Sequence, residues 1–216
     1  MRSRMLAAAA VLAWLPGCAP APETPKKETK AEAKPPATAP DVFKVRLETT
    51  KGDIVMEIHK AWSPRGAEHF YRLVTSKFYD GVKFHRVLKQ FVAQFGINGD
   101  PQIQGLYATL RIDDDPPKQK NRRGMVTFAK LGPNSRTTEV FINLRDNAVL
   151  DSGGFAPIGK VVEGMDVADK LTYLYGELAP RGAGPDPAKA ARLGVKYLER
   201  DFPRLDAIKT ARVVFP

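Results

Sequence analysis

Three stretches of the chain hold the residues whose types could bind and act on a substrate. Residues 84–94 (FHRVLKQFVAQ) place a guanidinium at Arg86 and an amide at Gln94 among apolar positions, and further stretches follow at residues 132–143 (GPNSRTTEVFIN) and 150–161. A guanidinium stays charged and offers only hydrogen-bond donors. Arg86 lies between residues that alternate inwards on one predicted strand, which favours a role in a site over an ordinary surface position.

Metal and disulfide chemistry find little support in the sequence. The single cysteine, Cys18, excludes an intramolecular disulfide, and no cluster of Cys and His has the spacing of a zinc site. The aspartates at residues 113–115 could be calcium ligands, but two prolines follow them, and the glycine and closing glutamate of an EF-hand loop are missing. We therefore expect a solvated loop there, and neither a metal nor a cofactor.

The three stretches resemble the core of the cyclophilins, in the family's order and close to its spacing. The resemblance covers roughly residues 42–173, and the tail at residues 176–214 is similar to an extension found in some bacterial members. It implies a mainly β fold, a closed antiparallel eight-stranded β-barrel of cyclophilin type with flanking α-helices. It also implies peptidyl-prolyl cis–trans isomerase activity, which accelerates the isomerisation of X–Pro bonds during folding.

This activity asks for a particular kind of site. An X–Pro bond isomerises over a barrier of ~18–20 kcal/mol, because the nitrogen lone pair is conjugated into the carbonyl. A catalyst needs an apolar slot for the proline ring and a fixed donor that favours the twisted amide, without a covalent intermediate or a cofactor. By the resemblance, Arg86 matches the catalytic arginine, and Gln94 should orient Arg86 or the substrate carbonyl.

The resemblance also assigns the substrate-binding residues. The backbone at Ala129 and Lys130 should pair with the peptide as a partial strand, which makes such sites tolerant of sequence. Without the motif around them, the apolar members of the site would be interpreted as ordinary core, and His85 as a hydrogen-bonded structural residue. The residues that match the family's proline pocket are Phe91, Val92, Phe141 and Leu150.

Three positions depart from the family pattern at this site. Glu139 replaces a glutamine, Val149 a tryptophan, and Phe155 stands near a histidine position. Glu139 would place a carboxylate close to Arg86, where an ion pair could hold the guanidinium or compete with the substrate. We favour the positioning role. Val149 removes an indole that family members use to grip cyclosporin, so we expect weak inhibition, and Phe155 keeps the pocket apolar.

The elements that must position these residues can be read from periodicity. Residues 42–48 alternate and turn at residues 51–53 into a second strand, so they predict a β-hairpin. Ser63 before a proline predicts a capped helix start, and several short apolar runs with turns between them predict an antiparallel barrel or sandwich. We also expect helices at residues 165–173 and 188–200, and a last strand at residues 207–215.

The N-terminal region has the composition of a leader followed by a tether. Residues 1–17 read as a signal peptide, and the small residue before Cys18 resembles a bacterial lipobox, which implies lipidation of that cysteine. An ordinary signal peptide that contains a cysteine is the alternative. Residues 18–40, rich in Pro, Ala and Lys, predict a tether. Residues 41–216 then form the cyclophilin-like domain, with its extension beginning near residue 176.

Charge and composition limit the classes of partner that the chain can be expected to bind. The 216 residues have a net charge of +10, yet Lys and Arg are spread along the chain, which favours a solvated basic surface over nucleic-acid binding. We expect a monomer that acts on proline-containing polypeptides and is held by its lipid in the cell envelope. Ala19 after the cysteine favours the outer membrane, facing the periplasm. The alternative function is a chaperone that binds proline-containing segments with little isomerase activity.

Overall fold

The computed structural model describes residues 37–214. The predicted signal peptide, the lipidation at Cys18 and most of the tether lie outside the described residues. Among the described residues, no helix is both long and apolar enough to span a membrane.

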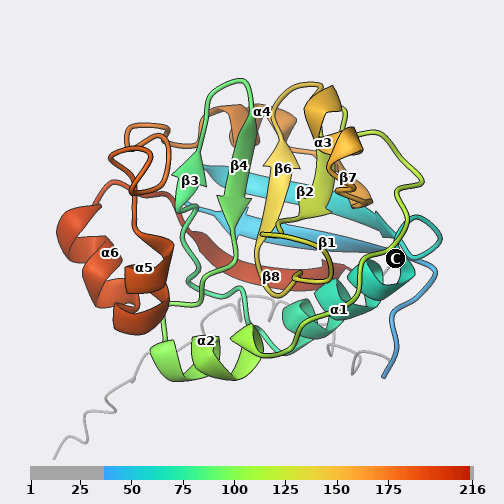
Figure 1. The fold of residues 1–216 in the computed structure, drawn as a ribbon, viewed down its shortest axis with the longest axis horizontal. Coiled ribbons are helices and arrows are strands. Elements are labelled where there is room, and N and C mark those ends of the chain that lie inside the picture. Colours follow the sequence, from blue (N-terminus) through green and yellow to red (C-terminus); the bar gives the residue numbers. More distant parts are fainter. Residues whose placement is uncertain (1–36, 215–216) are drawn as a thin grey trace, which may run out of the picture. The chain divides into compact units, whose positions relative to one another are not determined.

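The described part of the chain is built on one antiparallel sheet of eight strands, in the order β3-β4-β6-β5-β7-β2-β1-β8 (Figure 1). The prediction of eight antiparallel strands is confirmed. Their bounds are β1 Val42–Thr49, β2 Gly52–His59, β3 Arg86–Val87, β4 Val92–Phe95, β5 Met125–Phe128, β6 Val140–Asn143, β7 Pro157–Glu163 and β8 Ile208–Val214.

The sheet curls into a half-barrel with flanking helices, so the predicted fold class is confirmed. The edge strands β3 and β8 share no ladder in the described chain. An isolated bridge between Lys83 and Ala207, and a hydrogen bond from the Phe84 amide to the Asp206 carbonyl (2.9 Å), join the segments that precede these two strands. The two sheet edges meet without a full ladder because β3 has only two residues and offers too few backbone groups to form one.

The first two strands form the predicted hairpin. Along β1, exposed and buried residues alternate strictly, and Phe43, Val45 and Leu47 point into the core. The turn lies at Thr50 and Lys51, slightly earlier than predicted, since Thr49 already pairs with Gly52. The period of two therefore predicted the buried face correctly.

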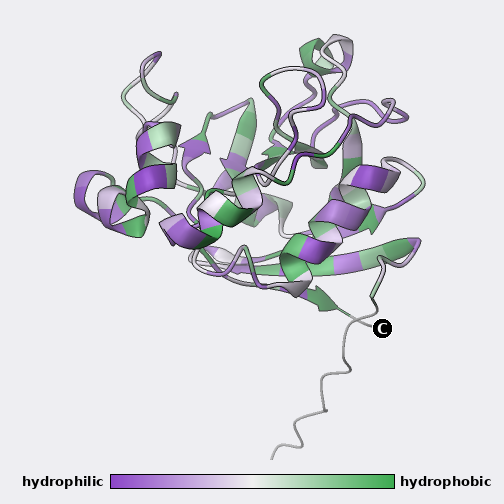
Figure 2. Ribbon diagram, turned by 60° about the horizontal axis from the view of Figure 1, so that its bottom comes forward, coloured by the Kyte–Doolittle hydropathy of each residue, from purple (hydrophilic) through white to green (hydrophobic). Residues whose placement is uncertain are grey.

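Helices cover the sheet and its ends. α1 (Pro64–Thr75) packs against β2, β7 and β8, and its ribbon alternates between hydrophobic and hydrophilic residues (Figure 2). On its inner face, Phe70, Leu73 and Val74 are buried in the main hydrophobic cluster. The other helices are α2 Pro101–Ala108, α3 Ala148–Ser152, α4 Met165–Asp169, α5 Pro187–Leu193 and α6 Val195–Asp201. α4 is thus shorter than the predicted helix at residues 165–173.

α1 begins at Pro64 after the N-cap residue Ser63, as predicted, but the capping interaction differs. Ser63 makes no capping hydrogen bond with its side chain, and its hydroxyl donates to Asp115 at 2.5 Å instead. The Asp115 carboxylate accepts the helix amides of Arg65 (3.3 Å) and Gly66 (3.0 Å) and lies 3.1 Å from Nη2 of Arg136. Asp115 is 3% exposed. The expectation of a solvated aspartate loop is therefore wrong for Asp115, which caps the helix from a distant loop.

The C-terminal extension forms a small second core beside β3, where α5 and α6 stand at the left of Figure 1. The predicted helix at residues 188–200 is broken at Gly194, which has φ +67° and lies against the Gly99 backbone, where a Cβ would lie 2.3 Å from the carbonyl oxygen. The second cluster consists of Ile97, Ala190, Tyr197, Leu198 and Leu205, with Tyr175, Ala191 and Phe202 packed on it. Since Ile97 directly follows the β4 region, this core fixes the extension next to the sheet edge.

Candidate active site

Strand register brings the predicted catalytic residues into one row. Arg86 on β3 pairs with Gln94 on β4, Gln94 pairs with Phe141 on β6, and Phe141 pairs with Thr127 on β5. Paired residues on neighbouring strands project from the same face of a sheet. Phe95 follows Gln94 on β4 and lies in the main core. Because successive residues of a strand point to opposite faces, the row of Gln94 occupies the face away from that core.

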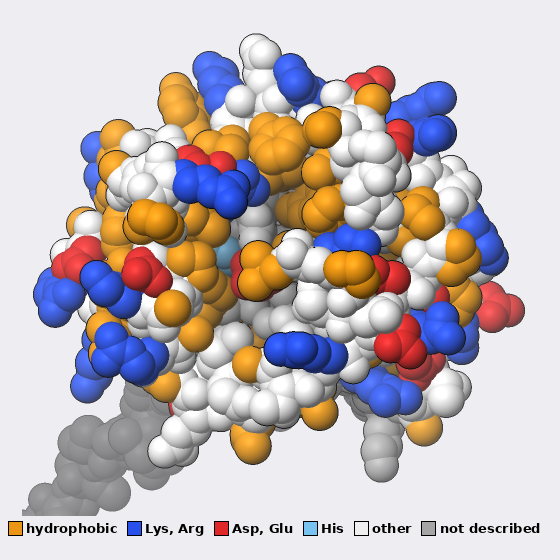
Figure 3. Space-filling model, viewed as in Figure 1, with side chains coloured by type: hydrophobic (Ala, Val, Ile, Leu, Met, Phe, Trp, Pro, Cys, Tyr) orange, Lys and Arg blue, Asp and Glu red, His pale blue; other side chains and the backbone are white. Residues whose placement is uncertain are grey.

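Apolar side chains surround this row. Val92 (1% exposed) and Phe141 (4%) form a buried floor outside the main core cluster, whereas Phe91, Leu150 and Phe155 are half-buried. The rings of Phe141 and Phe155 meet edge to face at 6.0 Å between centroids. Figure 3 shows a hollow in the face formed by β4 and β6, with hydrophobic side chains around it. The residues assigned to the proline pocket therefore lie together.

Leu150 on α3 and Phe155, which follows that helix, form the outer side of this apolar wall and are held by hydrogen bonds. The Phe155 amide donates to the Leu150 carbonyl at 3.2 Å. Asn121, which is 1% exposed, donates through Nδ2 to the Phe155 carbonyl (2.9 Å) and to the Asp151 carboxylate (3.0 Å). These bonds tie α3 and the segment before β7 to the loop that precedes β5. Val149, by contrast, is 70% exposed on α3.

A chain of polar side chains runs behind the apolar wall. Nη1 of Arg86 donates to Oε1 of Gln94 at 3.2 Å, and Nε2 of Gln94 donates to Oε2 of Glu139 at 2.7 Å. Nε2 of His85 lies 3.0 Å from the same carboxylate oxygen and must be the protonated nitrogen, because a carboxylate only accepts. His85 is 1% exposed, and its Nδ1 has no hydrogen-bond partner among the residues the structure describes.

Glu139 thus acts differently from the ion pair we expected. Its carboxylate reaches Arg86 only through Gln94, which lies between them. Burial opposes its ionisation, but the hydrogen bonds from His85 and Gln94 and the nearby charge of Arg86 outweigh this and lower the pKa of Glu139 below its ordinary value. Glu139 is therefore an ionised acceptor that fixes the amide of Gln94.

The carboxylate that pairs with Arg86 directly is Glu177, which sequence reasoning missed. Nε and Nη2 of Arg86 donate to its two oxygens, each at 2.6 Å. This bidentate pair lowers the pKa of Glu177 below its ordinary value. The two residues are 91 positions apart, and no local pattern marks Glu177 among the loop residues of the extension. Arg86 also lies over the Phe91 ring, with 5.5 Å between Cζ and the ring centroid.

The predicted peptide-pairing segment follows β5. The Ala129 amide already donates to the Glu139 carbonyl at 2.9 Å, so a peptide paired with this residue would have to use its carbonyl. Nζ of Lys130 bonds to Asp114 at 2.9 Å and lies 5.4 Å from the centroid of the Phe155 ring. The Lys130 side chain is thereby fixed as part of the wall beside Phe155.

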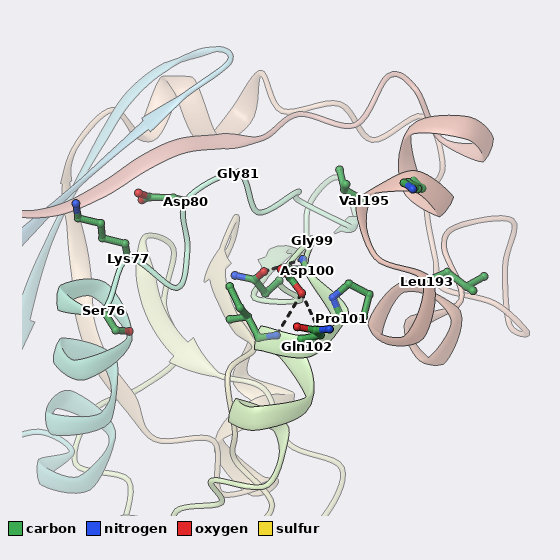
Figure 4. A pocket seen from close by; sticks show the side chains of 13 residues that line it. Ser76, Lys77, Asp80, Gly81, Gly99, Asp100, Pro101, Gln102, Leu193 and Val195 are labelled. Carbon is green, nitrogen blue, oxygen red and sulfur yellow. Dashed lines mark hydrogen bonds between the residues drawn. The ribbon is translucent and has the colours of Figure 1, made fainter.

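A second pocket, of about 1070 Å³, lies between the end of α1, the start of α2 and the helices of the extension (Figure 4). Asp100 on its lining uses one carboxylate oxygen to accept the amides of Gln102 and Ile103, and so caps α2. None of the predicted site residues lines this pocket. Across residues 37–214, no three His, Cys, Asp or Glu side chains are grouped as a metal site would require.

Comparisons with known proteins show which family the chain belongs to. Residues 44–184 match the family model described as cyclophilin type peptidyl-prolyl cis-trans isomerase/CLD. The chain is 35% identical over 139 residues to peptidyl-prolyl cis-trans isomerase A of Dickeya dadantii, covering 62% of this chain and 73% of that protein. It is 31% identical over 147 residues to peptidyl-prolyl cis-trans isomerase ppi1 of Schizosaccharomyces pombe, covering 65% and 92%.

Solved structures show the same fold. A cyclophilin type peptidyl-prolyl cis-trans isomerase of Cryptosporidium parvum, crystallised in the presence of the dipeptide Ala-Pro, superimposes with a TM-score of 0.59 at 22% identity, over 80% of this chain and 99% of that one. The matched sequence and the shared fold together lead to one conclusion. The chain belongs to the cyclophilin-type peptidyl-prolyl cis–trans isomerases, and its activity is the isomerisation of X–Pro bonds.

Proposed function

We propose that this isomerase twists the X–Pro bond by donating a hydrogen bond from Arg86 to the prolyl nitrogen, without a covalent intermediate or a cofactor. One observation supports this above all: register places the Arg86 guanidinium and Phe141 in the same row, so a permanently charged donor lies beside an apolar wall. A donor aimed at the nitrogen favours the twisted amide, in which the lone pair has left its conjugation with the carbonyl.

The neighbouring residues have separate tasks in this mechanism. The buried floor receives the proline ring, and the half-buried side chains close around it. Gln94 holds the guanidinium, and the backbone at residues 129–130 pairs with the peptide. The residues that contact the proline ring in this proposal are Phe91, Val92, Phe141, Leu150 and Phe155. Because the reaction moves no proton, His85 serves as a buried support for Glu139 and not as a base.

The test is the cis-to-trans rate of a short X–Pro peptide at low temperature, where the uncatalysed reaction takes minutes. We expect Arg86→Ala in the full chain to lower kcat/KM by roughly 100-fold or more, the loss typical of removing a preorganised donor. Arg123→Ala is the matched control, since Arg123 also forms a bidentate pair, with Asp169, away from the site. A rate retained in Arg86→Ala would show that Arg86 is not the donor.

We further propose that the substrates are exported or envelope proteins, and that the enzyme is anchored by a lipid on Cys18 to the outer membrane, facing the periplasm. The support is the sequence pattern before the domain, which resembles a signal peptide with a lipobox. The test compares the full chain with Cys18→Ser in bacterial cells. We expect the wild-type chain in the outer-membrane fraction with a lipid-sized mass increase at its N-terminus. Unmodified Cys18 in a soluble fraction would contradict the anchor.

A further inference from the structure

The catalytic arginine is held from two sides. Glu177 accepts hydrogen bonds from Nε and Nη2 of Arg86, and Gln94 accepts one from Nη1. A guanidinium has five N–H donors, one on Nε and two on each terminal nitrogen. Three are used by these bonds, so one N–H on Nη1 and one on Nη2 remain for a substrate. The bonds to Glu177 and Gln94 therefore fix the plane of the Arg86 guanidinium and still leave two N–H donors for the substrate.

The extension presents Glu177 on a tightly closed loop. The Gly184 amide donates to the Glu177 carbonyl at 2.8 Å, and the Gly182 amide donates to the Leu178 carbonyl at 3.0 Å. A Cβ at Gly182 or Gly184 would lie 2.5 or 2.6 Å from the Glu177 carbonyl oxygen, so neither position has room for a side chain. The Leu178 amide also donates to Oε1 of Glu177 at 2.8 Å and fixes its carboxylate.

The loop is in turn attached to the second core. Tyr175, two residues before Glu177, packs edge to face on Phe202 with 5.1 Å between ring centroids. Its hydroxyl accepts the Arg204 amide at 3.2 Å. The position of the Glu177 carboxylate therefore depends on the folding of α5 and α6, which contribute none of the predicted site residues themselves.

We propose that Glu177 is a positioning residue for Arg86, so that the C-terminal extension completes the active site of this isomerase. This inference rests on the proposed role of Arg86. A long arginine side chain has several rotamers, and a donor must be held at the prolyl nitrogen in the transition state to be effective. Glu177 and the Gln94–Glu139 pair remove this freedom before the substrate arrives.

The test measures kcat and KM for an X–Pro peptide with the full chain and with Glu177→Gln. We expect kcat to fall roughly tenfold, because small misplacements of a catalytic group cost one to two orders of magnitude in rate. KM should stay within about twofold, since the interaction matters mainly in the transition state. Glu199→Gln is the control: Glu199 also belongs to the extension and pairs with Lys83 at 3.6 Å, away from the site. It should keep the wild-type rate.

A double-mutant cycle separates positioning from a general effect on the fold. If Glu177 acts through Arg86, Glu177→Gln should cause no further loss in the Arg86→Ala background. The Nε–H of Arg86 should also give a slowly exchanging NMR signal in the wild-type chain, and Glu177→Gln should abolish this protection.

Three results would overturn the inference: a Glu177→Gln rate equal to or above that of the wild type, the same loss with and without Arg86, or an unprotected Nε–H in the wild type. Failure of the proposed mechanism is distinguishable, because it would appear first as an unchanged rate in Arg86→Ala alone.

Discussion

Removal of the Asp115 carboxylate should destabilise the domain strongly. Its side chain is 2% exposed and accepts the Ser63 hydroxyl, the Gly66 amide and the guanidinium of Arg136, which is 3% exposed. Asp115→Ala leaves the first turn of α1 without its acceptor and the hydroxyl without a partner. It also removes one of two carboxylates from a buried arginine, which keeps Asp114 at 3.4 Å.

The size of the effect follows from these losses. A lost helix cap costs about 1 kcal/mol. Loss of a partner in a buried charge pair costs about 3–5 kcal/mol, and the lower end applies here because Arg136 retains Asp114. Since these contributions overlap at one carboxylate, we expect a fall of about 3 kcal/mol in the free energy of unfolding. For a domain of this size, that corresponds to a decrease of roughly 6–12 °C in Tm.

The pH dependence gives a second readout. Burial opposes ionisation of Asp115, but the bonds from Ser63, Gly66 and Arg136 outweigh it and lower the pKa of this carboxyl below its ordinary value of 3.8. A lowered folded-state pKa means that the stabilisation is present above pH 3.8 and is lost as the pH falls through the lower value. The difference in stability between wild type and Asp115→Ala should therefore be constant near neutrality and shrink below about pH 4.

Urea unfolding followed by circular dichroism measures both effects. Asp113→Ala is the matched control, because Asp113 is in the same run of aspartates but is exposed. We expect it to change the free energy of unfolding by less than about 0.5 kcal/mol. If Asp115→Ala were as mild as this control, or if its effect did not diminish in acid, the assignment of Asp115 as a buried cap would be refuted.

Other measurements test the site. Glu139→Gln should lower kcat/KM a few-fold, because Gln94 loses a charged acceptor; a severalfold rise in turnover would contradict the positioning role. Inhibition by cyclosporin should be weak, since Val149 offers no indole, and nanomolar inhibition in a peptide assay would show this prediction wrong. Gly184→Ala should reproduce the kinetic loss of Glu177→Gln, as its Cβ would collide with the Glu177 carbonyl; a wild-type kcat would mean that the loop tolerates the change.

Much of the fold could be predicted because its signals are local. The alternation along β1 specifies which face is buried, and the structure shows that face in the core. Element ends were less predictable. The helix expected at residues 188–200 divides at Gly194, where a close approach to the Gly99 backbone requires a residue without a side chain. Propensity gave no indication of that contact, because it depends on a segment nearly a hundred residues away.

In the site, too, some features could be predicted from the sequence and others could not. The motif around Arg86, Gln94 and Phe141 identified residues that the strand register places in one row, since each stretch is a strand of the same sheet. The partner expected for Arg86 was Glu139, which is close in the sheet but bonds to Gln94 instead. Sequence spacing can predict which strands carry the site, but not which acceptor a long side chain reaches.

By itself, the sequence determined the strand pattern, the family and the residues of the apolar slot and the catalytic row. Only the tertiary structure decided that Glu177 pairs with Arg86, that Asp115 caps α1 and that β3 and β8 share no ladder. The physical reason is the range of the interactions. Periodicity reports which face of an element avoids water, whereas a buried ion pair or cap forms between loops whose paths depend on the packing of the whole domain.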